Sequence, residues 1–360
     1  MIRFHNNSTN SMFESLIENT EIRFTTCDEF RPQIKAACSS NPDIAAYHEI
    51  GKSEAGRRID VVILGHGAQR VSLIAGAHSD EPVGPETLRT FLLNSIRHKD
   101  RLKELFITFQ FLVVPHINPD GEARNQGWIK KWPHVEAYLE GVFRELPGRD
   151  LEFGFPAMRP ENRHVSQFLR ENGPVAMHAS LHSMSFSEGA FLLIERHWIE
   201  RTQQLRKKFA RAALDFGLNL HDHDRHGEKG FHYIEAGFTT TPEGQAMRRF
   251  FKNKGDAEMA ALFHDSSMEF VRQLGGDPLC LVTELPLFVI NKKRKNSPAG
   301  IPESYLAFKD KIPELRIRLQ QNRSIAETIA EFEITPLDLA TASKLQLRAI
   351  QLGLETISHA

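Results

Sequence analysis

Short apolar segments alternate with helical patterns along much of this 360-residue chain. The segments are rich in β-branched and aromatic residues, which is typical of buried strands. Strands that alternate with helices predict an α/β fold, in which helices cover both faces of a sheet. The strand candidates are Arg58–Leu64, Val71–Ala75, Phe106–Val114, Ala176–Leu181, Ala190–Ile194 and Leu279–Leu285.

Two helices are predicted between these strands. Gly84–His98 carries apolar residues at helical spacing. Trp198–Phe216 places its apolar side chains on one face, and Gly217 follows where a left-handed C-cap is expected. Residues 1–45 are predicted to be a helical lead-in to a central domain over residues 46–296.

Residues 297–360 are predicted to form a helical C-terminal extension. Helices are expected over Pro302–Leu319 and Ser324–Phe332, and Thr335 and Pro336 offer an N-cap and a first helical position. The last helix carries one apolar stripe, formed by Ala340, Leu347, Ile350, Leu354 and Ile357. This stripe either folds back on the domain or forms a homo-oligomer contact, and the pattern is compatible with both.

The composition indicates where the protein is expected to be located and which classes of partner it is expected to lack. Net charge is −1 and the pI is near 7.0, so no nucleic-acid or anionic-membrane partner is indicated. The three cysteines are few and far apart, which argues against a disulfide framework. The start lacks the apolar core of a signal peptide, and no apolar run is long enough for a membrane span. A cytoplasmic location is therefore expected.

His78 and Glu81 stand three residues apart in a Gly- and Pro-rich turn directly after a predicted strand. Zinc takes nitrogen and oxygen ligands, and a catalytic site leaves one position for water. Alone the pair is a weak signal, because histidine and glutamate occur at this spacing by chance. His182 stands at another strand end, and open α/β sheets place their sites at such ends. An isolated histidine is more often a core residue, but the agreement of all three favours a metal site.

Glu284 lies inside the otherwise apolar segment LCLVTELPLF. A carboxylate is seldom buried unless it is paired, bound to a metal or functional. A structural salt bridge and a solvent-facing position at the end of the sheet are the alternatives.

The order of these motifs resembles the M14 zinc carboxypeptidases over about residues 55–290. The matching stretches are His78–Glu81, NPDG at Asn118–Gly121, Ser180–Ser183 and Thr283–Leu285. The resemblance implies a mixed, mostly parallel, twisted eight-stranded sheet between helices, and makes residues 46–296 a catalytic domain. It also implies one zinc ion held by His78, Glu81 and His182, with Glu284 as general base.

The resemblance extends to three further positions. Asp150 matches an aspartate that orients a zinc-bound histidine, here His78. Arg124 is the better match, and Lys130 the weaker one, for an arginine that stabilises the oxyanion. A surface arginine is an equally good interpretation of Arg124.

The pair of residues that binds the substrate carboxylate in the family is not matched. Glu152 and Phe153 stand where the family has asparagine and arginine, and they are expected to contact substrate together with Ser183. Either another arginine binds the carboxylate, or the substrate is not a peptide C-terminus, which we favour as a hypothesis. The candidate arginines are Arg159, Arg163, Arg248 and Arg249.

The expected activity is zinc-dependent hydrolysis of an amide bond in a peptide or small molecule, with unusual specificity. The alternatives are a deacylase of N-acyl amino acids, a metal-free binding protein, and an assembly protein that uses the C-terminal helices. The histidine-rich segment 221–232 is interpreted as a solvated loop, with a second metal site or a cleft wall as alternatives. Metal content separates the enzyme hypotheses from the others.

Overall fold

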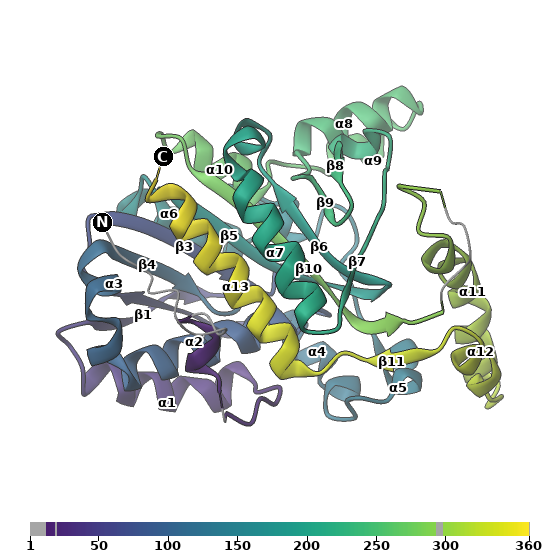
Figure 1. Ribbon diagram of the computed structural model, residues 1–360, viewed down its shortest axis with the longest axis horizontal. Coiled ribbons are helices and arrows are strands. Elements are labelled where there is room, and N and C mark those ends of the chain that lie inside the picture. Colours follow the sequence, from purple (N-terminus) through teal and green to yellow (C-terminus); the bar gives the residue numbers. More distant parts are fainter. Residues whose placement is uncertain (1–11, 19, 293–297, 360) are drawn as a thin grey trace.

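The computed structural model describes residues 12–18, 20–292 and 298–359. A large mixed sheet runs through its centre, with helices on both sides (Figure 1). In the described residues the sheet has eleven strands. The main path is β1-β2-β4-β3-β5-β10-β6-β9-β8, with β7 beside β6 and β11 beside β10. The strands are β1 (Ala45–Lys52), β2 (Arg58–Leu64), β3 (Gln69–Ala75), β4 (Phe109–Val114), β5 (Met177–Ser187), β6 (Gly189–Ile194), β7 (Asn219–Leu220), β8 (Tyr233–Glu235), β9 (Phe238–Thr240), β10 (Leu279–Ile290) and β11 (Ile334–Pro336).

The helices cover both faces of this sheet. They are α1 (Cys27–Ser39), α2 (Val83–Arg97), α3 (Lys103–Thr108), α4 (Pro119–Ile129), α5 (Val135–Gly141), α6 (Pro160–Asn172), α7 (Gln203–Asp215), α8 (Gly244–Asn253), α9 (Ala257–Ala261), α10 (Ser267–Gln273), α11 (Glu303–Gln320), α12 (Ala326–Glu331) and α13 (Leu339–Ile357). None of the helices in the described ranges is both long and apolar enough for a membrane crossing.

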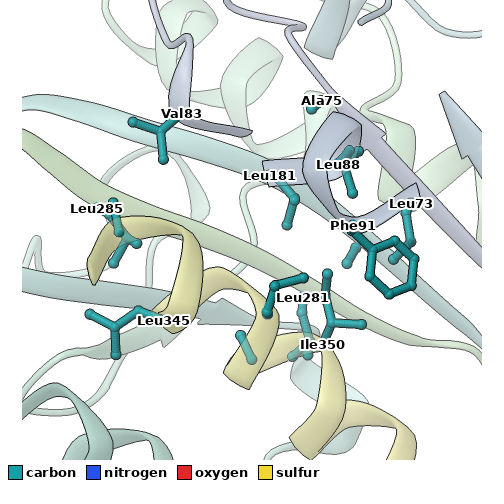
Figure 2. Packing of buried hydrophobic residues seen from close by; sticks show 14 of the residues in the cluster. Leu73, Ala75, Val83, Leu88, Phe91, Leu181, Leu281, Leu285, Leu345 and Ile350 are labelled. Atoms are coloured by element: carbon teal, nitrogen blue, oxygen red, sulfur yellow. The ribbon is translucent and has the colours of Figure 1, made fainter. Parts of the chain in front are cut away.

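Strand β3 shows why its sequence is an unbroken apolar run. Successive side chains of a strand point to opposite faces, and here both faces are covered. Leu73 packs with α2 and α13 in the larger hydrophobic cluster, whereas Ile74 belongs to the cluster beneath α6 and α10. Figure 2 shows the larger cluster, with Phe91 of α2 and Ile350 of α13 in the same layer. The central strands β4, β3, β5 and β10 are mutually parallel.

The α/β fold is confirmed, with several differences in detail. The sheet has eleven strands in the described residues instead of eight, because short strands such as β8 and β11 extend it. The strand predicted over Phe106–Val114 begins only at Phe109, and the residues before it form the end of α3. The helix predicted over Trp198–Phe216 is regular only over α7, although Gly217 does adopt a left-handed φ of 76°.

The start of the last helix was predicted wrongly. Thr335 and Pro336 belong to β11, where Thr335 pairs with Val289 of β10. The helix begins after Asp338, whose carboxylate accepts a hydrogen bond from Thr341 N at 2.8 Å. Thr335 and Asp338 are both suitable N-cap residues. Because Thr335 is paired in β11, the helix begins after Asp338. The predicted boundary between residues 296 and 297 lies outside the described residues.

Helix α13 packs its apolar stripe against the sheet and its neighbouring helices. Leu347, Ile350 and Leu354 are fully buried, and α13 contacts α2, α7 and β10. Gln346 of this helix also donates a hydrogen bond to the backbone oxygen of His182, at 3.1 Å. The C-terminal helix is therefore part of the same hydrophobic core.

Candidate metal centre and active site

Three segments bring the predicted residues together at one edge of the sheet. His78 and Glu81 lie in the turn between β3 and α2, and His182 lies in the parallel neighbour β5. Glu284 of β10 is the direct register partner of His182. The strand end expected at His182 is not observed, because β5 continues to Ser187 and β10 to Ile290. Strand β3 ends at Ala75, opposite Leu181, so His182 and Glu284 lie within their strands just beyond the end of β3, next to the turn that carries His78 and Glu81.

His78, Glu81 and His182 form the one group of potential metal ligands found among the described residues. Nδ1 of His78 lies 3.1 Å from Oε1 of Glu81 and 3.0 Å from Nδ1 of His182. Nδ1 of His182 lies 2.9 Å from Oε2 of Glu81. Two atoms bound to one zinc, each at about 2.0–2.2 Å, can be at most about 4.4 Å apart. The donor types and their spacing therefore fit a zinc ion.

Each histidine has its second nitrogen beside a carboxylate. Nε2 of His78 lies 3.3 Å from Oδ2 of Asp150, and Nε2 of His182 lies 3.2 Å from Oε2 of Glu152. Such carboxylates fix the tautomer and the orientation of a metal-binding histidine. In both histidines this contact leaves Nδ1 facing the common centre.

Glu152 has a position that the sequence did not indicate. It was expected to contact substrate, but both of its oxygens have partners within the protein. Oε1 accepts from Ser267 Oγ at 2.6 Å, and Oε2 accepts from Ser180 Oγ at 3.1 Å. The 3₁₀ turn Leu151–Phe153, capped by Asp150, places Asp150 and Glu152 against the two histidines. The available signal in the sequence was a pair of carboxylates two residues apart, Asp150 and Glu152, after the NPDG segment.

The carboxylates of Glu81 and Glu152 favour a positive charge on or beside His182. Burial disfavours the imidazolium of His182, but Glu81 and Glu152 overcome this effect and raise its pKa to about 10. The two carboxylates thus favour a positive charge beside this imidazole, which either a proton or a metal ion can supply.

Arg144 lies beside this centre, and Arg124 does not. Nε of Arg144 is 2.6 Å from Oδ1 of Asp80, and its Nη2 contacts Oε1 of Glu81. Arg124 stacks on the ring of Phe143, 3.2 Å from its centroid, and lines a neighbouring hollow. Arg144, and not Arg124, therefore lies next to the three grouped residues.

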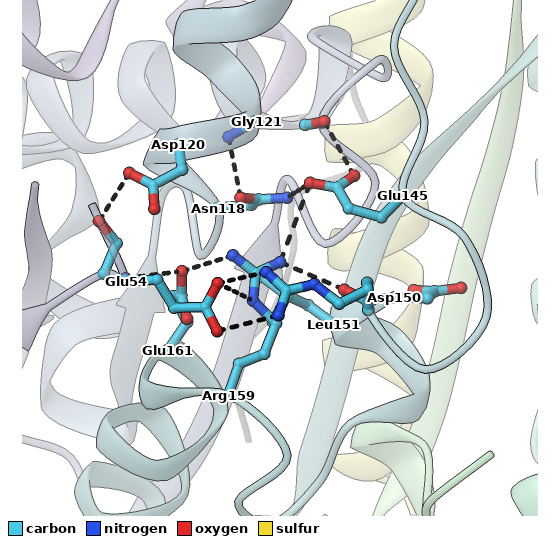
Figure 3. A network of polar contacts seen from close by, with 12 residues as sticks. Glu54, Asn118, Asp120, Gly121, Glu145, Asp150, Leu151, Arg159 and Glu161 are labelled. Atoms are coloured by element: carbon cyan, nitrogen blue, oxygen red, sulfur yellow. Dashed lines mark hydrogen bonds and ion pairs between the residues drawn. The ribbon is translucent and has the colours of Figure 1, made fainter. Parts of the chain in front are cut away.

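The NPDG segment supports the turn that carries His78. Asn118 caps α4 by accepting from Gly121 N at 3.0 Å, and it also donates to Glu145 (Figure 3). A Cβ at Gly121 would lie 2.3 Å from Cβ of Ser79, so only glycine allows this contact with the neighbour of His78. The NPDG motif thus supports the turn that carries His78 by packing against its neighbour Ser79.

Glu284 and both histidines line one pocket of about 320 Å³. Burial, followed by the charge of Glu81, raises the pKa of Glu284 to about 8. Phe153 lines this pocket, with its ring against Phe263. Ser183 lies in a second pocket on the other side of the centre, and its backbone N donates to Glu81 at 3.1 Å. Tyr305 and Lys309 of α11 line that second pocket.

None of the four candidate arginines lines either pocket. Arg159 is buried with Glu161, and Arg248 contacts Asp265 and the backbone oxygen of Phe263. Arg163 and Arg249 are exposed. The arginines that do line the main pocket are Arg144 and Arg225, and Arg225 lies in the histidine-rich segment 221–232.

Comparison with known proteins agrees with the site. A family model described as zinc carboxypeptidase, Peptidase M14, matches residues 33–152, which contain His78, Glu81 and Asp150. Zinc carboxypeptidase A 1 of Drosophila melanogaster is 26% identical over 136 residues, 35% of this chain and 31% of that protein. Carboxypeptidase M of Mus musculus is 30% identical over 167 residues, 41% of this chain and 36% of that protein.

Over its first half this chain is thus similar to the M14 zinc carboxypeptidase family. The matches span about a third of the length of these curated relatives. The fold comparison covers more of the chain. The metallocarboxypeptidase of Pseudomonas aeruginosa, solved with (2-guanidinoethylmercapto)succinic acid, superposes with a TM-score of 0.51 at 15% identity, over 92% of this chain and 70% of that one. This likeness confirms the zinc carboxypeptidase fold.

Proposed function

We propose that this protein is a zinc-dependent metallopeptidase of the M14 kind that hydrolyses an amide bond. The convergence of His78, Glu81 and His182 beside Glu284, in one pocket, carries the proposal. His78, Glu81 and His182 would hold the zinc ion. A bound zinc supplies Lewis acidity, which polarises the substrate carbonyl and acidifies a water molecule.

The protein's own side chains would carry out the proton transfers and hold the metal ligands in place. Glu284 is the general base: its carboxylate takes a proton from the attacking water and delivers it to the leaving nitrogen. Burial and the charge of Glu81 raise the pKa of Glu284, so its carboxylate takes up a proton more readily than that of a free glutamate. Asp150 and Glu152 hold the histidines in orientation.

Arg144 is proposed to stabilise negative charge on the substrate oxygen in place of Arg124. It lines both pockets at the centre, and its guanidinium remains charged. Its contacts with Asp80 and Glu81 fix its position before substrate binds.

Hydrolysis of a panel of N-blocked dipeptides and N-acyl amino acids tests this proposal. We expect release of the C-terminal residue from some dipeptides, loss of that activity on chelation, and recovery with zinc. Cleavage of N-acyl amino acids alone would assign a deacylase instead. Zinc-loaded protein that cleaves neither class would contradict an amide hydrolase and favour a binding role.

A further inference from the structure

Arg225 is a half-buried cation in the same pocket as His78, His182 and Glu284. It lies on the segment between β7 and β8, and its guanidinium stacks over Phe231, 3.9 Å from the ring centroid. In the described part of the chain this guanidinium has no ion pair or hydrogen bond within the protein. Arg225 and Glu284 line the same pocket, and the charge of Glu284 acts on the guanidinium.

Other cations around the pocket already have partners. Arg144 is paired with Asp80 and Glu81, and Lys229 lies 3.7 Å from Glu228. Burying a charge without a partner costs free energy, because water no longer solvates it. A guanidinium stacked on an aromatic ring keeps its N–H edge available for a planar anion such as a carboxylate. Arg225 is thus placed to bind an anion that the protein itself does not supply.

The wall around Arg225 is apolar. Pocket residues from several elements surround this side, namely Leu193, Phe231, Met247, Phe251, Phe263 and Val282. A ligand that fills it therefore combines a carboxylate with an aromatic or aliphatic group. Glu152, which the sequence suggested would repel a carboxylate, has its oxygens bound to Ser267, Ser180 and His182.

We propose that Arg225 binds the carboxylate of the substrate and that the apolar wall holds the side chain of the same residue. This inference rests on the proposed function, since the carboxylate then marks the part released on hydrolysis. The carboxylate-binding arginine would thus come from segment 221–232, while the position expected from the family is occupied by Glu152 and Phe153.

Binding of two matched probes to the zinc-loaded protein tests this inference. 3-Phenylpropanoate carries the carboxylate and the ring, and 3-phenylpropan-1-ol carries the ring alone. We expect Arg225→Gln to weaken binding of the carboxylate by about 10–100-fold, as for loss of a charged hydrogen bond. Binding of the alcohol should stay within about threefold, and Arg225→Lys should retain part of the carboxylate affinity.

Arg249→Gln is the matched control, because Arg249 is exposed on the neighbouring helix α8. Equal carboxylate affinity in wild type and Arg225→Gln would overturn the inference, as would equal loss of both probes or no carboxylate binding to wild type. Carboxylate binding that depends on zinc and not on Arg225 would overturn it too. Zinc content and amide hydrolysis are measured on the same samples, so a failure of the proposed function is seen separately.

Discussion

Glu284→Gln is expected to lower kcat for amide hydrolysis by about 10²–10⁴-fold, the range typical of a lost general acid–base group. Glutamine keeps the shape of the side chain but cannot take a proton from water. Glu284 lies in the pocket next to His182 and is not one of the three grouped ligands, so zinc should remain bound. Steady-state kinetics and zinc content, measured on the same preparation, check both parts.

The control for this variant is Glu355→Gln. Glu355 pairs with Lys208 on α7, away from the pocket, and its replacement should leave kcat unchanged. The pH profile adds a second readout. Activity should fall as the pH drops through the pKa of Glu284, because the protonated carboxyl is no longer a base; a bound cation moves that pKa below about 8. Turnover near the wild-type rate in Glu284→Gln would refute its role as base.

Glu152→Gln is expected to weaken zinc binding by about 10–100-fold, the usual effect of losing an outer-shell partner of a metal ligand. Glutamine can still accept hydrogen bonds from Ser267, but it removes the negative charge beside Nε2 of His182. That charge favours the tautomer that leaves Nδ1 free for the metal. Competition with a chelating dye measures the zinc affinity directly.

Glu161→Gln serves as the matched control because Glu161 is equally buried but pairs with Arg159. Its zinc affinity should equal that of wild type. Unchanged zinc affinity in Glu152→Gln would refute the positioning role. Equal loss in both variants, with a lower melting temperature, would indicate damage to the fold instead.

The residues of the centre could be predicted because they lie on regular strands or at their ends. The runs around β3, β5 and β10 are recognisable from composition, and parallel strands bring His78, His182 and Glu284 to one edge. The turn after a strand is short, so Glu81 stays close to His78. Asp150 could be named only from the resemblance to the M14 family.

The residues that the sequence did not reveal lie on irregular segments. Arg144 and Arg225 are carried by segments 142–149 and 221–232, whose paths follow from tertiary contacts and have no periodic pattern. The same holds for Glu152, whose role depends on Ser267 at the start of α10, 115 residues away in sequence. Charge and residue type alone could not distinguish Arg225 from the four exposed or paired arginines.

The metal centre itself is tested by the zinc content of the purified, untagged protein, measured beside His78→Ala and His182→Ala. We expect about one zinc ion per chain in wild type, as for a three-ligand catalytic site, and loss of zinc in both variants. Protein without zinc, or zinc that persists unchanged in both variants, would contradict a metal centre formed by His78, Glu81 and His182.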